Sequence, residues 1–251
     1  MLLQFAHTLI KTVKMHYLVT GATGGLGSVI CDELLSLGHK VSVFVRDKAK
    51  ISERDNLFVV EIDLVEIEKL IGAVNLAAQT MGKFDGFVHC AGVELTAPLK
   101  ILKSEEIEHG MKIHLYSALE ISKGLLKPRN RNESMSLVMI SSVMGSLGEK
   151  AKIGYSSMKG ALTNVVKSMA LELADKGVRV NSVSPGLIKT KMSVEVLNKI
   201  GEEKTNLILA KHPLGFGETV DVANAVSFLL SPKSKWITGI DLKVDGGYSA
   251  Q

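Results

Sequence analysis

Cysteine, tryptophan and long apolar runs are scarce in this sequence. Its two cysteines, Cys31 and Cys90, lie in apolar stretches without metal-ligand or CxxC spacing, so we expect reduced packing residues, no metal site and a cytoplasmic protein. No apolar run approaches the roughly 18 residues that span a bilayer, which excludes membrane insertion. No basic run exceeds a few residues, so the net charge of +4 does not indicate a nucleic-acid partner.

The N-terminal segment, residues 1–14, lacks the features of a signal peptide. No basic stretch precedes its apolar residues, and no small-residue cleavage site follows them. The first convincing strand begins near His16, directly after a second methionine, Met15. We therefore expect residues 1–14 to be a peripheral extension or a translation-start artefact, and residues 15–251 to form the domain.

Short β-branched runs alternate with stretches of helical period along the chain. This alternation predicts βαβ units and a parallel sheet covered on both faces. With 46% hydrophobic residues and no linker or repeat, we expect one Rossmann-type, doubly wound α/β domain. The predicted strands are 16–20, 40–45, 57–63, 86–90, 136–141, 178–184 and 241–245, and the predicted helices are 25–38, 66–82, 104–127, 155–175 and 219–230. The stripe expected to face the sheet in helix 155–175 is Met158, Leu162, Val165, Met169 and Leu173.

A glycine-rich turn, GATGGLG at 21–27, joins the first strand to the first helix. Gly21 lets the chain reverse tightly, Gly25 lets the backbone approach a pyrophosphate, and Gly27 lets the helix lie close to the strand. The helix N-terminus then offers free N–H groups and a positive dipole end to phosphates. The turn predicts a dinucleotide-binding site.

Tyr155 and Lys159, four positions apart on a predicted helix, share one face of it. Free tyrosine has a pKa of about 10, and a nearby ammonium lowers that pKa toward the range that acid–base chemistry needs at neutral pH. The pair therefore suggests a proton-transfer site, although a surface Tyr and Lys would show the same spacing.

Several segments, in order, resemble the motifs of the short-chain dehydrogenase/reductase family. They are TGATGGLG at 20–27, DL at 63–64, HCAG at 89–92, NSVSPG at 181–186 and ITGIDLKVDGG at 237–247. The glycines fit both the TGxxxGxG of the short single-domain branch and the TGxxGxxG of the longer sugar-nucleotide branch, and chain length favours the short branch. The resemblance implies an NAD(P)-dependent oxidoreductase.

The resemblance also implies which residues bind the cofactor. By position in the family motifs they are Gly21, Thr23, Gly25, Leu26, Gly27, Arg46, Asp63, Leu64, Cys90, Ala91, Gly92, Tyr155, Lys159, Pro185, Gly186, Ile188 and Thr190. Arg46 follows the second strand, where an acidic residue would bind the ribose hydroxyls of NAD. A guanidinium there can pair with the 2′-phosphate of NADP, so we favour NADP(H) over NAD(H), although Asp47 follows directly.

The family places a catalytic serine thirteen residues before the tyrosine, which is Ser142 here. Its hydroxyl would stabilise charge that develops on the substrate oxygen. Ser141 is the alternative, but strand alternation directs it to the other face. The implied reaction is hydride transfer between nicotinamide C4 and a carbonyl or secondary alcohol, with Tyr155 exchanging the proton and Lys159 also holding the nicotinamide ribose.

His114 stands where the family usually has an asparagine that holds a water in a proton relay to the lysine. An imidazole can also bond a water, but its length and its titration differ. We favour a substituted relay with a modest kinetic effect over an altered pH profile or a weakened enzyme.

The substrate is less well defined by the sequence. The segment 187–217 is expected to contact it, with side chains that line an apolar pocket or pack the segment onto the body: Met192, Val194, Val196, Leu197, Ile200, Leu207 and Ile208. The C-terminal segments most resemble 3-oxoacyl-[acyl-carrier-protein] reductases, which implies an acyl-thioester substrate. Lys176 is placed to meet an acidic carrier, but Glu133 stands where those reductases commonly have arginine, with Arg129 and Arg131 nearby.

Two alternatives stay open. One is a dehydrogenase for an alcohol, a polyol or a secondary-metabolite ketone. The other is a cofactor-binding protein with vestigial catalysis, because His114 and Cys90 occupy positions usually held by asparagine. The family resemblance further implies a homotetramer built through helices 104–127 and 155–175.

Overall fold

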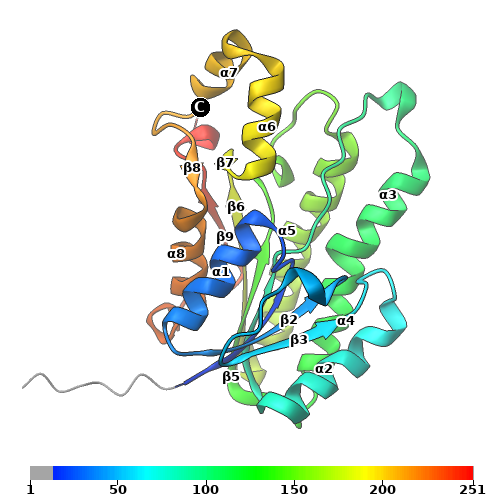
Figure 1. Ribbon diagram of the computed structural model, residues 1–251, viewed down its shortest axis with the longest axis vertical. Helices are drawn as coiled ribbons and strands as arrows, with labels where there is room; N and C mark the ends of the chain where they lie inside the picture. The colour runs from blue at the N-terminus through cyan, green and yellow to red at the C-terminus, as the bar shows by residue number, and fades with distance from the viewer. Residues whose placement is uncertain (1–13, 251) are drawn as a thin grey trace, which may run out of the picture.

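The computed structural model describes residues 14–250, apart from the side chains of Met192, Val196, Lys199 and Ile200. The predicted extension, residues 1–14, therefore lies outside the described residues except for Lys14. Within the described part of the chain, seven parallel strands form one sheet in the order β3-β2-β1-β4-β5-β6-β9 (Figure 1). The strands are β1 His16–Thr20, β2 Lys40–Val45, β3 Leu57–Glu61, β4 Phe84–His89, β5 Arg131–Ile140, β6 Val178–Pro185 and β9 Asp241–Val244.

Helices cover both faces of the sheet. One apolar layer joins it to α1 (Gly25–Ser36) and α8 (Thr219–Leu230), and the other joins it to α2 (Ile67–Met81), α4 (Ser117–Leu125) and α5 (Ile153–Leu173). Successive strand residues point to opposite faces, so that Leu137 contributes to the second layer and Val138 to the first. This arrangement confirms the doubly wound α/β fold expected from the strand and helix pattern.

Most element boundaries match the sequence prediction, with two informative differences. The predicted helix 104–127 consists of α3 (Ser104–Met111), a π-helical turn (Lys112–Tyr116) and α4. On α5, Val166 and Ala170 are buried, whereas Val165 and Met169 are only partly buried. The buried stripe advances in steps of four from Met158 to Ala170, so it turns gradually around the helix relative to the predicted stripe.

The segment after β6 is more ordered than a loop. Strands β7 (Ile188–Lys189) and β8 (Gly217–Glu218) pair in parallel, and α6 (Lys191–Ile200) and α7 (Glu202–Leu209) lie between them. Figure 1 shows this helical pair beyond the carboxyl ends of the strands. Short 3₁₀ turns occur at Lys48–Lys50, Leu99–Ile101, Val143–Gly145, Ala174–Lys176, Pro232–Ser234 and Tyr248–Ala250. None of the helices in the described part of the chain is long and apolar enough to cross a membrane.

Leu137 provides a test of the core. Its side chain is 0% exposed at the centre of the sheet, so we expect Leu137→Ala to lower the free energy of unfolding by about 2–5 kcal/mol through lost burial and a cavity. Leu214, in the segment before β8, is 87% exposed, and Leu214→Ala should change stability by less than about 0.5 kcal/mol. Urea unfolding measures both, and equal effects would contradict this account of the core.

Candidate active site

The glycine turn lies against the chain that leaves β4. Gly21 has a φ of +75°, and a Cβ placed on it would come within 2.7 Å of the Ala91 nitrogen and 2.9 Å of the Cys90 carbonyl carbon. A Cβ on Gly27 would come within 2.2 Å of the Gly21 oxygen. Both positions therefore require glycine. Because β1 pairs with β2 on one side and β4 on the other, the turn sits where the strand order reverses, the usual place for a bound dinucleotide.

The surroundings of this turn fit a dinucleotide. Helix α1 begins at Gly25, and no side chain caps it, so its first N–H groups are available to a phosphate. A Cβ on Gly25 would lie 3.2 Å from the Cβ of Thr190, so the chain after β7 approaches the turn closely. The structure thus brings predicted cofactor residues together at the turn after β1, because Cys90 and Ala91 follow β4 and Thr190 follows β7.

Acidic and basic side chains share a hollow at the end of β2 and β3. It has a volume of about 420 Å³ and is lined by Arg46, Glu61, Ile62, Asp63 and Glu66. Asp47 caps the following turn, because one of its carboxylate oxygens accepts a 3.0 Å bond from the Ala49 N–H. Sequence reasoning missed Glu61, which faces the same hollow as Arg46.

Tyr155 and Lys159 lie on α5 near the end of β5, where Ser142 begins a short turn. The Lys159 Nζ is 5.8 Å from the centroid of the Tyr155 ring and donates a 2.7 Å bond to the Ile140 carbonyl. The Ser142 hydroxyl accepts from the Met144 N–H at 3.2 Å, and it lies close enough to Tyr155 to lower the pKa of that residue. Ser141 instead bonds to the Lys159 carbonyl and to the Thr163 hydroxyl, so it packs β5 against α5.

Burial controls the ionisation of this cluster. Burial, followed by the charge of the Glu94 carboxylate, raises the pKa of Tyr155 to about 12, and hydrogen bonding to Ser142 opposes this shift. Burial also lowers the pKa of Lys159 to about 8. The prediction that Lys159 brings the pKa of Tyr155 toward neutrality is therefore wrong for this structure, because desolvation of the phenolate outweighs any attraction to the ammonium. Tyr155 keeps its proton at neutral pH, as a proton donor must.

Two charged side chains beside Tyr155 were not among the predicted site residues. Glu94, after β4, forms an ion pair with Lys152, the N-cap of α5. The Lys152 Nζ also lies 5.8 Å from the centroid of the Tyr155 ring. The three-residue spacing of Lys152 and Tyr155 on one helix could have indicated their proximity. No local sequence pattern indicated the contact of Glu94 with α5, because Glu94 and Lys152 are 58 residues apart.

His114 lies in the π-helical turn, with its ring edge-on to Tyr155 at a centroid distance of 6.2 Å. Its Nε2 is 3.0 Å from the Val93 nitrogen and 2.9 Å from the Val93 oxygen, while its Nδ1 is buried without a partner among the described residues. Burial, and then the charge of Lys159, lowers the pKa of His114 to about 3. The ring is neutral in the range where enzymes work.

A second buried histidine, His89, lies behind the same region. The Thr20 hydroxyl bonds to its Nδ1 at 3.0 Å, and its Nε2 lies 3.1 Å from the Ile113 carbonyl oxygen, which it can meet only as a donor. Burial, followed by the charges of His114 and Lys159, lowers the pKa of His89 to about 3. Two neutral histidines therefore connect the end of β1, the end of β4 and the π-helical turn. The resemblance of HCAG to a family motif did not indicate that His89 would bond to Thr20 and Ile113.

A further hollow lies between α6 and α7. It has a volume of about 410 Å³, and its lining includes Val194, Leu197 and Phe216. Leu207 is 64% exposed and does not line it. The side chains of Met192, Val196 and Ile200 lie outside the described residues. Part of the predicted apolar set thus faces a hollow in the described structure.

The chain is similar to known reductases over most of its length. A family model described as Enoyl-(Acyl carrier protein) reductase matches residues 21–249. The chain is 32% identical over 236 residues to the 3-oxoacyl-[acyl-carrier-protein] reductase FabG of Rickettsia bellii, covering 92% of this chain and 95% of the relative. It is 34% identical to the reductase of that name from Buchnera aphidicola over 244 residues, covering 95% and 98%. A solved structure named "ElxO with NADP Bound" superposes with a TM-score of 0.87 at 29% identity, covering 95% and 100%.

The Glu94 carboxylate raises the pKa of both Tyr155 and Lys159, so its removal should lower both. For a site in which these groups must hold protons, we expect Glu94→Gln to move the loss of activity at high pH toward lower pH by about half a pH unit. The pH dependence of kcat/KM measures this change. Glu149→Gln is the control, because Glu149 is exposed and shifts neither pKa. An unchanged high-pH limb in Glu94→Gln would contradict the coupling.

Proposed function

This chain belongs to the short-chain dehydrogenase/reductase family of NAD(P)-dependent oxidoreductases, and we propose that it reduces the carbonyl of a 3-oxoacyl thioester with NADPH. The observation that carries the reaction class is the cluster of Ser142, Tyr155 and Lys159 near the carboxyl edge of the sheet that also holds the glycine turn. The similarity to 3-oxoacyl reductases supports the substrate class.

In the proposed mechanism, a nicotinamide cofactor held at the glycine turn and by Lys159 would supply the hydride that reduces the carbonyl carbon. Tyr155 donates its phenolic proton to the carbonyl oxygen, so that the C=O double bond becomes C–H and O–H. Ser142 donates a hydrogen bond to the same oxygen as negative charge develops on it. Lys159, with a pKa of about 8, can return a proton to Tyr155 near neutral pH and can hold the nicotinamide ribose.

His114 takes the place of the usual relay asparagine in this proposal. A neutral imidazole can accept a hydrogen bond at one nitrogen and donate at the other, which a water relay requires. Because its pKa is about 3, His114 should not add a titration step to activity between pH 5 and 8. Its unpartnered Nδ1 supports the proposal, since a buried ring nitrogen ordinarily has a partner such as a water.

We propose NADP(H) as the preferred cofactor. Arg46 is exposed at the end of β2, and the Lys50 ammonium lies 3.8 Å from the Asp47 carboxylate, which offsets part of the negative charge that would oppose a phosphate. Glu61 in the same hollow works against a phosphate, so the preference depends on Arg46. The structural neighbour named for its bound NADP supports the same choice.

The carrier-binding part of the proposal rests on exposed charges at the opposite edge of the sheet. Lys176 and Arg129 are exposed, which suits an acidic partner. Glu133 is also exposed, and a Cβ on Gly177 would lie 2.6 Å from its carbonyl oxygen, so Glu133 is close to the Lys176 turn. Its negative charge weakens this surface for an acidic carrier, which keeps an alcohol, polyol or ketone dehydrogenase as the second candidate.

We also propose a homo-oligomer, in line with the tetramer implied by the family resemblance. Leu171 on α5 is 85% exposed, and Tyr116 in the adjoining π-helical turn is 48% exposed. Exposed apolar side chains on the two elements expected to assemble support that interface.

Tyr155→Phe tests the chemistry. The variant lacks the proton donor, so we expect kcat for acetoacetyl thioester reduction to fall by about a thousandfold, with NADPH binding and circular dichroism unchanged. Tyr116→Phe, at an exposed tyrosine outside the cluster, should keep its activity.

The wild-type protein is assayed in parallel on acetoacetyl thioesters and on a panel of alcohols and polyols. Turnover of the alcohols or polyols without turnover of the thioesters would contradict the thioester proposal and leave hydride transfer as the reaction class. Tight NADPH binding with no turnover on any substrate would favour vestigial catalysis.

Arg46→Gln tests cofactor preference. Loss of the guanidinium should raise the KM for NADPH by about tenfold, because one charge-assisted pair with the 2′-phosphate is lost, and should leave the KM for NADH unchanged. Steady-state kinetics with both cofactors measures the two values. A parallel rise with both cofactors would show that Arg46 does not recognise the phosphate.

A further inference from the structure

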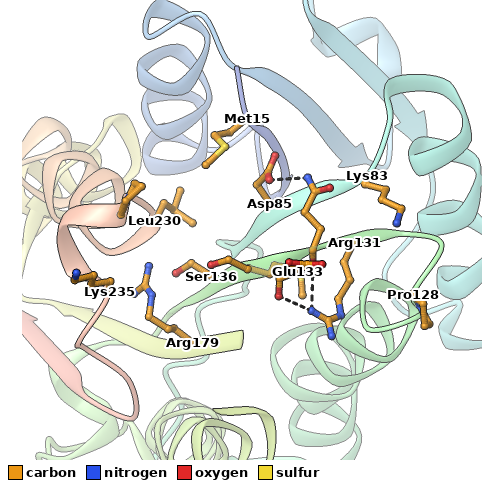
Figure 2. Close-up of a pocket in the computed structure, with 14 residues that line it drawn as sticks. Met15, Lys83, Asp85, Pro128, Arg131, Glu133, Ser136, Arg179, Leu230 and Lys235 are labelled. Carbon is orange, nitrogen blue, oxygen red and sulfur yellow. Dashed lines mark hydrogen bonds between the residues drawn. The ribbon is translucent and has the colours of Figure 1, made fainter. Parts of the chain in front are cut away.

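A second large hollow opens at the edge of the sheet opposite the glycine turn. Its volume is about 780 Å³, and it is bordered by the beginnings of β4, β5 and β6 and by the end of α8. Figure 2 shows Arg179 and Lys235 on one side of it and Lys83 and Arg131 on the other, with Asp85 between them. The chemical step of the proposed reaction does not use this region, although Glu133 also borders the surface considered above for an acyl carrier.

Positive charge dominates the lining. Four cationic side chains face two carboxylates, Asp85 and Glu133, and none of these six groups forms an ion pair with another described residue. Asp85 accepts bonds on both oxygens, from the His16 N–H at 2.8 Å and from the Asn132 amide at 2.7 Å. These neutral donors already hold the Asp85 carboxylate, so the cations have no direct carboxylate partner.

The guanidinium groups of Arg179 and Arg131 are oriented by main-chain carbonyls and have no carboxylate partner among the described residues. Arg179 donates to the carbonyls of Leu229, Ser231 and Ile237, and burial lowers its pKa, so its charge is poorly solvated. Arg131 donates through Nη1 to two main-chain carbonyls, and its Nε is buried without a partner among the described residues. Carbonyls orient a guanidinium but do not neutralise it, and an oxyanion would do so with paired hydrogen bonds.

We propose that this hollow binds a small phosphorylated molecule. Its volume falls in the range of about 300–1,000 Å³ typical of small-molecule sites. A concave surface with cations on two sides suits a compact polyanion better than the flat face of a protein. The side chains of residues 1–13 do not supply the negative charge that would neutralise these cations, because the segment contains a lysine and no carboxylate side chain.

Isothermal titration of the NADPH-saturated protein with inorganic pyrophosphate tests the proposal, because NADPH fills the phosphate-binding turn at the other edge. We expect binding that weakens as salt rises, and a loss of affinity of about fivefold to tenfold in Lys235→Gln and in Lys83→Gln. Lys233→Gln is the matched control: Lys233 is exposed in the 3₁₀ turn that directly precedes Lys235 but does not line the hollow. All three replace lysines that form no ion pair with a described residue, so the fold should survive.

Three results would overturn the proposal. One is the absence of pyrophosphate binding at millimolar concentration. Another is an equal loss of affinity in Lys233→Gln, which would indicate general surface attraction. The third is binding of poly-glutamate without binding of pyrophosphate, which would assign the surface to an acidic polypeptide.

Discussion

The backbone of Gly21 lies so close to Cys90 and Ala91 that no side chain fits between them. This contact joins the chain leaving β1 to the chain leaving β4, and it depends on both strands ending at one edge of a parallel sheet. The first turn of α1, the loop that carries Glu94 and the approach of Thr190 to Gly25 are all arranged around that junction. A dinucleotide site here follows from packing of main chain on main chain, with side chains added at its margins.

Desolvation links the chemistry to the fold. The packing that buries α5 against the sheet favours the uncharged form of every titratable group it encloses. It holds the proton on Tyr155, lowers the proton affinity of Lys159 and keeps His114 and His89 neutral. The negative charge that develops on a substrate oxygen is then stabilised mainly by hydrogen bonds, since nearby charges are few and the Glu94 charge is paired with Lys152.

Features with a local cause could be predicted from the sequence. The strand HYLVT, the requirement for glycine at Gly21 and Gly27, and the shared helix face of Tyr155 and Lys159 all depend on a few neighbouring residues. Properties that depend on the assembled interior could not be predicted. The direction of the Tyr155 pKa shift depends on burial by distant segments, and the contact of Glu94 with Lys152 joins positions 58 residues apart.

The segment between β7 and β8 shows the same contrast between features with a local cause and features that depend on the assembled fold. Its apolar residues indicated a surface that packs or binds, but their spacing did not reveal two short helices, because the break at Gly201 interrupts the helical period. Of the charged residues that line the hollow at the other edge of the sheet, the sequence indicated only Arg131 and Glu133, as charges that could face an acidic carrier. Lys83, Arg131, Arg179 and Lys235 come from four separate segments, and only the strand order brings them together.

The π-helical turn at Lys112–Tyr116 determines where His114 lies within its helix. A π turn accommodates one residue more than an α-helical turn over the same full rotation, so the extra residue does not rotate α3 relative to α4. Deletion of one residue from this turn would therefore leave a regular α-helix with α3 and α4 in nearly the same orientation. The change would fall on the residues inside the turn, and His114 would move relative to Val93. The extra residue thus positions the imidazole without altering how the rest of the helix packs.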